Sequence, residues 1–292
     1  MIDQYPRITV VTPSYNQGDF LEFTIKSVLE QGYPNLEYII IDGGSTDYSA
    51  DIIKKYADRL TYWVSEKDSG MYEAIQKGFE RSTGEIMTWI NSDDMHNQNS
   101  LFTVAEIFAA LPKVNWIMGK NSYYDEEGKV FVFDDDPYEE RWSKWRMYDF
   151  RGRFIQQESV FWRRNLWEKS GAYVDTSLAL AGDADLWLRF FRHDKLYSTG
   201  FLLSGFRFRQ GNQKSKDYRD EYLDETRMLI KRELKLSNSH AQFWLIRMLK
   251  VFAFLVPVGL LRKRFLSAAL RLTPKISYFP SAGYSFNKKY HR

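Results

Sequence analysis

The sequence contains no cysteine, and this absence excludes three kinds of chemistry. Without thiols the chain forms no disulfide bond, builds no thiolate metal site and carries no cysteine nucleophile. Histidine is almost as scarce: four residues in 292, without the spacing of a zinc site. Any catalytic or binding chemistry is therefore expected to rest on carboxylates, hydroxyls, amides and basic side chains.

Long hydrophobic runs are missing as well. The longest apolar stretch, residues 251–261, has 11 residues, whereas a membrane-spanning helix needs roughly 20. Residues 1–6 lack the basic and apolar regions that open a signal peptide. We therefore expect neither a transmembrane helix nor a cleaved leader, and a cytoplasmic location.

Acidic residues are absent from one end of the chain. Residues 237–292 contain ten Lys and Arg residues but no Asp or Glu. Residues 1–236 hold 31 basic and 38 acidic residues, a net charge of −7 that the overall value of +3 conceals. This break in composition predicts two parts, an acidic body of residues 1–236 and a basic extension of residues 237–292.

The body has enough apolar material for a sizeable core, since 44% of the chain is hydrophobic and 17% aromatic. Its first third alternates short apolar runs with segments of helical spacing. Strands are expected at residues 8–11, 36–41, 60–64, 85–90, 116–119 and 130–133, with an extended segment at 197–209. Helices are expected at residues 18–31, 45–56, 71–81, 100–110, 183–193 and 217–236. Alternating strands and helices predict an α/β fold with a mostly parallel sheet covered by helices.

Three polar clusters directly follow expected strands, at residues 12–16, 42–47 and 91–94. Ligands of open α/β sheets bind beyond the carboxyl ends of the strands, so the three clusters are expected to converge. Each cluster alone is ordinary turn chemistry. Their joint occurrence at successive strand ends indicates a binding site.

The residue types in these clusters suit a nucleotide and a cation. Tyr15 can stack on a base, and Asp42 can accept hydrogen bonds from a ribose hydroxyl or a uracil N–H. The glycines after Asp42 allow close backbone approach, and the next helix N-terminus favours an anion. Adjacent Asp93 and Asp94 repel each other unless a hard divalent cation compensates their charge.

With these motifs the chain resembles the family 2 glycosyltransferases of the GT-A fold. The similarity runs through residues 7–215 in the order of that family. It is carried by residues 8–16 (ITVVTPSYN), 27–31 (SVLEQ), 40–47 (IIDGGSTD), 68–70 (DSG), 83–85 (TGE), 91–94 (NSDD) and 182–189 (GDADLWLR). The combination is specific for the family but not for any one sugar.

The resemblance implies a Rossmann-like, mostly parallel sheet flanked by helices, followed here by a helical extension. It implies an inverting glycosyltransferase that moves a sugar from a nucleotide-sugar, a UDP-sugar foremost, to a saccharide or lipid-linked acceptor in cell-surface polysaccharide biosynthesis. The residues that it assigns to the donor are Pro13, Tyr15, Asp42, Asp68, Asp93 and Asp94. Asp93 and Asp94 hold the metal-binding DXD position for Mn²⁺ or Mg²⁺, with Asp94 the expected direct ligand.

A further acidic residue, Asp183, matches the family's general base, which takes the proton from the acceptor hydroxyl. Asp185 is its close rival, and both acids also suit the first turn of a helix. Gln157 and Glu158 fall where the family lines the acceptor side. One departure stands beside the base, because Gly182 occupies a position where glutamate is usual.

The basic extension is expected to form amphipathic helices over residues 240–272 that lie on a membrane surface. The alternative is a helical extension packed on the body or on a protein partner. No nucleic-acid recognition motif is present. We expect a peripheral protein on the inner face of the cell membrane, and a body that still binds donor after deletion of residues 240–292.

Two other functional classes compete with sugar transfer. A dinucleotide-dependent oxidoreductase needs a G-x-G-x-x-G turn after the first strand, and residues 12–18 do not supply it. A non-catalytic scaffold could keep the fold and bind only a sugar nucleotide or a membrane. The presence of Asp42, Asp93, Asp94 and Asp183 argues against the scaffold.

Overall fold

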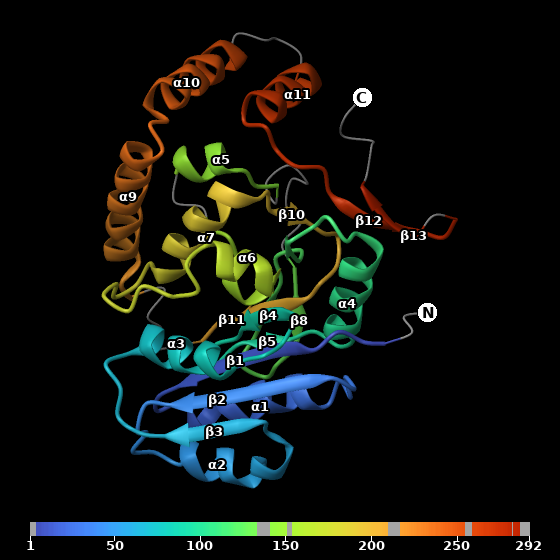
Figure 1. Ribbon diagram of the computed structural model, residues 1–292, viewed down its shortest axis with the longest axis vertical. Helices are drawn as coiled ribbons and strands as arrows, with labels where there is room; N and C mark the ends of the chain where they lie inside the picture. Colours follow the sequence, from blue (N-terminus) through green and yellow to red (C-terminus); the bar gives the residue numbers. More distant parts are fainter. Residues whose placement is uncertain are drawn as a thin grey trace.

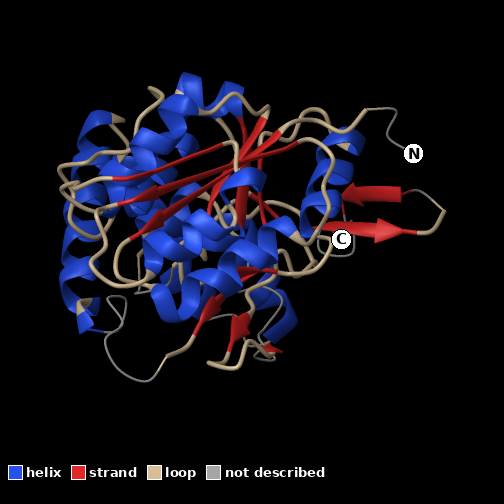
Figure 2. Cartoon of the chain, turned by 90° about the horizontal axis from the view of Figure 1, so that it is seen from below, coloured by secondary structure: helices blue, strands red, loops and turns tan. Residues whose placement is uncertain are grey.

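Seven strands form a central sheet in the order β10-β6-β9-β4-β1-β2-β3 (Figures 1 and 2). The computed structural model describes residues 4–132, 141–150, 154–209, 217–254, 259–281 and 283–286. The strands are β1 (Ile8–Ser14), β2 (Leu36–Asp42), β3 (Tyr62–Ser65), β4 (Ile86–Trp89), β6 (Trp116–Met118), β9 (Val160–Arg163) and β10 (Tyr197–Ser198). Strand β9 runs against β4 and β6, and the other neighbouring pairs are parallel, so the predicted mostly parallel sheet is confirmed.

Helices cover both faces of this sheet, which is why its central strands are apolar on both sides. All seven residues of β1 are buried. Because successive side chains of a strand point to opposite faces, Val11 packs with Ile39 and Ile41 on one face, and Val10 packs with Ile40 on the other. The first face meets helices α3 and α7, and the second meets α1 and α4.

The helices expected from the apolar periodicity are present. The helices of the body are α1 (Gly18–Leu29), α2 (Ser49–Lys55), α3 (Met71–Arg81), α4 (Ser100–Ala110), α5 (Lys144–Tyr148), α6 (Arg164–Lys169), α7 (Gly182–His193) and α9 (Arg219–Leu236). Helices α5 and α6 were not predicted. They have five and six residues, too few for a 3.6-residue period to be recognised.

A second sheet of four short strands lies beside the first. Its strands, in spatial order, are β5 (Met95–His96), β11 (Ser204–Arg207), β7 (Tyr123–Tyr124) and β8 (Val130–Phe131). Strand β5 follows the 91–94 cluster directly and pairs antiparallel with β11. This pairing carries a segment from more than 100 residues later in the chain to the third polar cluster.

The extension contains the expected helices α10 (His240–Phe254) and α11 (Gly259–Ala269), with residues 255–258 outside the described part. After them the structure adds a β-hairpin that was not predicted, β12 (Ile276–Phe279) and β13 (Gly283–Phe286). The hairpin returns to the body, where the Tyr284 hydroxyl donates to Glu106 of α4 at 2.7 Å. In the described residues no helix is both long and apolar enough to cross a membrane.

The extension packs on the body through several separate contacts. Ile276 is fully buried in the core cluster of α1 and α4, and the Thr273 hydroxyl donates to the Leu196 carbonyl at 2.6 Å. Lys250 of α10 forms an ion pair with Asp149. Deleting residues 240–292 would uncover these groups. Point substitutions on the extension therefore test its role without uncovering the core, and the boundary at residue 237 stays a prediction.

Candidate active site

The first two polar clusters meet at the carboxyl ends of β1 and β2. The Gly43 amide donates to the Ser14 carbonyl at 2.8 Å, which continues the strand pairing into the loops. Asn16 has a left-handed backbone with φ of 50°. In this conformation its side-chain oxygen accepts from the Thr46 amide at 2.8 Å, while its own amide donates to the Ser45 hydroxyl at 2.8 Å.

Asp42 lies fully buried beneath this pair of loops. Its carboxylate accepts from the Ser45 amide at 2.9 Å and from the Ser65 hydroxyl at 2.6 Å, so it joins β2 to β3. The other two predicted nucleotide contacts differ in exposure, since Pro13 is buried in β1 and the Tyr15 side chain is 60% exposed. An exposed ring next to an anchored carboxylate offers a surface on which a base can stack.

Asp68 lies directly over the second cluster. Both of its carboxylate oxygens stand 2.9 Å from the point that a Cβ atom on residue 43 would occupy. Glycine at this position therefore allows the carboxylate to approach the backbone closely. Burial raises the pKa of Asp68, and the Gly70 amide opposes this by donating to the carboxylate at 2.9 Å.

The third cluster joins the first two through arginines of the late strand β11 and the residues that follow it. The Arg209 guanidinium pairs with Asp93 at 2.8 Å and donates to the Gln17 side chain at 3.0 Å. The Arg207 amide donates to the Asp94 carboxylate at 2.9 Å. The predicted convergence of the three clusters is thus confirmed for the described residues.

Burial dominates the electrostatics of the aspartate pair. It raises the pKa of Asp94 well above its usual range, and the charges of Asp93 and Glu158 raise it further. Burial also raises the pKa of Asp93, against the opposing charge of Arg209. These carboxylates therefore hold more negative charge than the surrounding protein compensates.

Such a pair fits a hard divalent cation. Mg²⁺ is usually held in phosphate-binding sites by one or two carboxylates, with substrate phosphate and water oxygens as its other ligands. Fully buried Asp94 supplies oxygen donors of that kind, and so does Asp93, which is partly exposed and pairs with Arg209. In the parts of the chain that the structure describes, no three Asp, Glu or His side chains form a complete cage of protein ligands. Two carboxylates leave the other coordination positions of such a cation to phosphate and water oxygens.

Glu158 lies close enough to both Asp93 and Asp183 for their charges to act on it. It is buried, its Oε1 atom has no hydrogen-bond partner among the residues that the structure describes, and burial raises its pKa to about 7. The charges of Asp93 and Asp183 add to this rise, which places all three carboxylates in one electrostatic environment. Its neighbour Gln157 donates instead to the Trp89 carbonyl at 2.7 Å and holds this segment against β4.

Asp183 lies in the first turn of α7. Burial raises its pKa to about 6, and a hydrogen bond from the Tyr222 hydroxyl, 3.2 Å from Oδ2, opposes the rise. A carboxylate with this pKa is ionised at neutral pH but binds a proton far more readily than an exposed aspartate. This property suits a general base.

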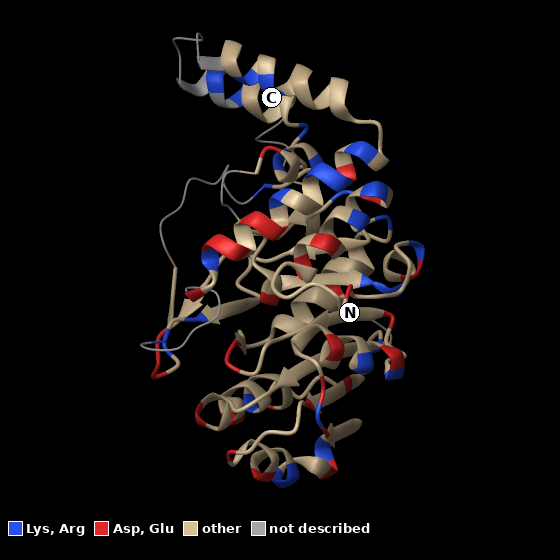
Figure 3. Cartoon of the chain, turned by 90° about the vertical axis from the view of Figure 1, so that its left-hand side faces the viewer, with Lys and Arg blue, Asp and Glu red and all other residues tan. Residues whose placement is uncertain are grey.

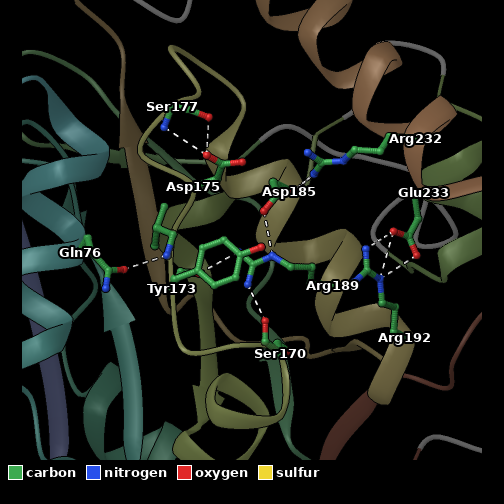
Figure 4. Close-up of polar contacts among 11 residues, drawn as sticks. Gln76, Ser170, Tyr173, Asp175, Ser177, Asp185, Arg189, Arg192, Arg232 and Glu233 are labelled. Atoms are coloured by element: carbon green, nitrogen blue, oxygen red, sulfur yellow. Dashed lines mark hydrogen bonds and ion pairs between the residues drawn. The ribbon is translucent and has the colours of Figure 1, made fainter. Parts of the chain in front are cut away.

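Asp185 is engaged differently, as Figure 4 shows. Its buried carboxylate pairs with Arg189 at 2.8 Å and with Arg232 of helix α9. Arg189 also donates to the Ser170 and Tyr173 carbonyls. Asp185 therefore holds α7, the preceding loop and α9 together. With both oxygens bound to guanidinium groups, it is the weaker candidate for the base.

Three contributors to the site were missed in the sequence. Arg207 and Arg209 lie two residues apart in a segment predicted to be extended, and alternate residues of a strand lie on the same face, so the sequence predicts that the two share one face. What they face was not readable, because β11 meets the 91–94 cluster only through tertiary pairing. Tyr222 carried no signal, because it lies 39 residues from Asp183.

The fold and the carboxylates at the strand ends together define a class of protein. A mostly parallel sheet whose strand ends carry a nucleotide-type loop pair and an aspartate pair has the architecture of GT-A enzymes. Residues 9–163, more than half of the chain, match the model of "Glycosyl transferase family 2". The chain belongs to this family.

Curated relatives match parts of the chain. The TuaG glycosyltransferase of Bacillus subtilis, named for teichuronic acid biosynthesis, is 38% identical over 104 residues, which cover 35% of this chain and 41% of the relative. An uncharacterized glycosyltransferase of Rickettsia typhi is 26% identical over 195 residues, 66% of this chain and 61% of the relative. The matched part is less than two thirds of each relative.

Solved structures share the fold along nearly the whole chain. S. aureus TarS 1-349 in complex with UDP-GlcNAc superposes with a TM-score of 0.60 at 15% identity and covers 97% of both chains. The mannosyltransferase PcManGT of Pyrobaculum calidifontis, in complex with GDP-Man and Mn²⁺, has a TM-score of 0.56 at 17% identity. It covers 91% of this chain and 86% of its own.

Proposed function

We propose that this protein is an inverting, metal-dependent glycosyltransferase that transfers a sugar from a nucleotide-sugar, a UDP-sugar foremost, to a saccharide or lipid-linked acceptor. One observation carries the proposal: on a family 2 scaffold, the charges of both Asp93 and Asp183 act on the buried Glu158. UDP-GlcNAc and GDP-Man with Mn²⁺ in related folds support a nucleotide-sugar and a cation. The teichuronic acid relative supports polysaccharide biosynthesis.

The residues divide the work between donor and acceptor. Tyr15 offers its exposed ring to the base, and Asp42 and Asp68 border the loops on which the ribose and sugar rest. Asp94 and Asp93 hold Mn²⁺ or Mg²⁺, which when bound stabilises the negative charge of the leaving diphosphate.

On the acceptor side, Asp183 takes the proton from the acceptor hydroxyl. The acceptor oxygen then forms the new bond to the anomeric carbon, while the bond from that carbon to the nucleoside diphosphate breaks on the opposite face. This direction of attack inverts the anomeric configuration. A positioned base accelerates such a step by roughly 10²- to 10⁴-fold. Gln157 and Glu158 lie on the acceptor side.

A screen of nucleotide-sugars for Mn²⁺-dependent release of the nucleoside diphosphate tests the activity, with calorimetry of UDP and Mn²⁺ as the binding measurement. Asp94→Asn is expected to lose the Mn²⁺-dependent part of UDP binding. Asp183→Asn is expected to keep it and to lose transfer. Full transfer activity in both variants would contradict the mechanism, and binding without turnover of any donor would favour the non-catalytic scaffold.

The surface of the extension supports a location at a membrane. Helix α10 exposes apolar side chains at helical spacing, whereas its Lys250 points to the body and pairs with Asp149. The exposed apolar residues of the two helices are Trp244, Leu245, Met248, Val251, Phe252, Leu261 and Phe265. Helices α10 and α11 lie at the end of the molecule opposite β2 and β3 (Figure 1) and carry no acidic residue (Figure 3).

An apolar stripe beside Arg247, Arg262 and Arg264 has the chemistry of a helix in a lipid interface. Each basic residue near an anionic surface adds about 1 kcal/mol of attraction. Within the proposal, α10 and α11 therefore hold the enzyme on the inner face of the cell membrane, where a lipid-linked acceptor is within reach.

A further inference from the structure

Helix α9 lies against α7 and reaches the predicted base with one side chain. The Tyr222 hydroxyl donates to both oxygens of Asp183, at 3.2 Å and 3.3 Å. The Tyr222 ring is itself held by an edge-on contact with Phe154, at a centroid distance of 5.1 Å. The direction of the hydroxyl is therefore fixed by packing rather than by the carboxylate alone.

A second side chain of α9, one turn further along, holds the backbone that leads into α7. The Glu225 carboxylate accepts from the amides of Ala179 at 3.2 Å, Leu180 at 2.9 Å and Ala181 at 2.5 Å. These amides precede Asp183 by two to four residues. One side chain thus fixes the path of the loop from which the base projects.

The opposite side of this loop is held by α3. The Tyr72 hydroxyl donates to the Leu180 carbonyl, and its ring lies 2.8 Å from the point that a Cβ atom on residue 182 would occupy. Glycine at position 182 is what allows this approach. The family's usual glutamate at this position would overlap the Tyr72 ring, which explains the departure seen in the sequence.

We propose that Tyr222 and Glu225 are positioning residues for Asp183, so that helix α9 orients the base of the reaction. Tyr222 holds the carboxylate, and Glu225 holds the loop 179–181. The inference rests on the proposed function in one respect, the role of Asp183 as base. The contacts themselves do not depend on it.

The two residues act on the Asp183 carboxylate in opposite directions. Tyr222 donates a hydrogen bond to the charged form and lowers the pKa, whereas the charge of Glu225 raises it. The other titratable groups that face Asp183 are Tyr72 of α3 and Glu158 of the segment before β9. Because Tyr72 and Glu158 are unchanged in variants of Tyr222 and Glu225, any difference in the pKa of Asp183 arises from α9.

The pKa of Asp183 can be measured directly by a ¹³C NMR titration of protein labelled at the aspartate carboxyl carbon, with Asp183→Asn identifying the signal. In Tyr222→Phe the pKa should rise by roughly half a unit to one unit, because one long hydrogen bond to the carboxylate is lost. In Glu225→Gln it should fall, because a neighbouring negative charge is removed. Tyr218→Phe, an exposed tyrosine directly before the first residue of α9, is the matched control.

A pKa in Tyr222→Phe that equals that of the control, or that falls, would overturn the inference. The titration needs no substrate, so its result stands whatever the donor is. With a donor identified, Tyr222→Phe should also lower kcat roughly tenfold, with unchanged UDP affinity and an acidic limb of the rate profile moved to higher pH. Full transfer activity in Asp183→Asn would refute the base assignment and leave the titration result intact.

Discussion

Burial controls the chemistry of individual residues at this site. Asp94, Glu158 and Asp183 have raised pKa values for the same first cause, removal of the carboxylate from water. Asp42 is also fully buried and accepts hydrogen bonds from Ser45 and Ser65. Perturbed pKa values are common at functional sites, and Asp94, Glu158 and Asp183 lie where ligand binding or proton transfer is proposed.

Asp183→Asn should stabilise the protein at neutral pH. Burial raises the pKa of Asp183 in the folded state to about 6, above its ordinary value of 3.8, so the native state binds the proton more tightly than the unfolded chain does. Protonated Asp183 therefore contributes to the free energy of unfolding below about pH 4, and this contribution is lost as the pH rises to about 6. Asparagine carries no charge to bury. We expect its free energy of unfolding to exceed that of wild type by about 1–2 kcal/mol above pH 7, with the difference shrinking towards pH 4.5.

Denaturant unfolding of both proteins between pH 4.5 and 8 measures this difference. A constant difference across that range would show that the carboxylate of Asp183 is not destabilised by burial. The combination expected here, higher stability with lost transfer, is the usual sign of a site that is kept strained for function.

At the scale of elements, helix α7 is held by contacts of two kinds. The buried Asp185 of α7 pairs with Arg189 of the same helix and with Arg232 of α9, and so joins the two helices (Figure 4). Its first residue, Gly182, meets α3 without a side chain. The position of Asp183 therefore depends on the packing of three helices around one turn.

Asp185→Ala should strongly destabilise the protein, because it leaves the buried Arg189 guanidinium without its carboxylate. Breaking a buried ion pair by removing one partner costs about 3–5 kcal/mol. The matched control is Asp224→Ala on α9, whose ion pair with Arg227 is exposed on both sides and is expected to cost less than about 1 kcal/mol. Equal unfolding midpoints for the two variants would contradict the structural role of Asp185.

Gly182→Ala tests the contact between α7 and α3. Alanine favours a helix over glycine by about 1 kcal/mol, but the new Cβ atom would lie 2.8 Å from ring atoms of Tyr72. Overpacking of this kind costs about 1–3 kcal/mol, so we expect a lower melting temperature. Gly200→Ala is the control, because within the described part of the chain no atom other than its own and those of its chain neighbours lies within 4 Å of the point that its Cβ atom would occupy. Its melting temperature should equal that of the wild type.

At the scale of the whole molecule, helices α10 and α11 differ from the body in charge. Acidic and basic residues are interspersed over the body, whereas α10 and α11 carry basic residues and no acidic ones (Figure 3). The extension is nevertheless anchored on the body through Ile276, Thr273 and Lys250. A membrane bound to α10 and α11 would therefore hold the body in a fixed orientation rather than on a flexible tether.

Replacing two exposed apolar residues of α10, in the double variant Trp244→Ser and Val251→Ser, should weaken binding to vesicles that contain anionic lipid. Each side chain is more than half exposed, so the fold should tolerate the change and UDP binding should stay the same. Sedimentation with the vesicles measures the effect. Tyr278→Ser on the hairpin, with similar exposure, is the control, and equal sedimentation of both proteins would contradict the membrane proposal.

The sequence by itself determined the order of strands and helices in the first third of the chain, because apolar periodicity is a local property. It also determined the three polar clusters, since residues that end successive parallel strands must meet at one edge of the sheet. Asp93 and Asp94 were identifiable for this reason and from the family resemblance, and Asp183 from the resemblance alone. Short elements such as α5 and the strands β5 and β7 were not identifiable, because two to five residues carry no readable period.

Only the tertiary structure decided what surrounds these acids. Arg207, Arg209 and Tyr222 reach them from segments 39 to 116 residues away in sequence, and no local pattern encodes such a pairing. The choice between Asp183 and Asp185 was likewise tertiary, because the partners of Asp185 include an arginine of α9. Local periodicity places a carboxylate on an element, whereas its charge, burial and partners depend on which distant segments fold against it.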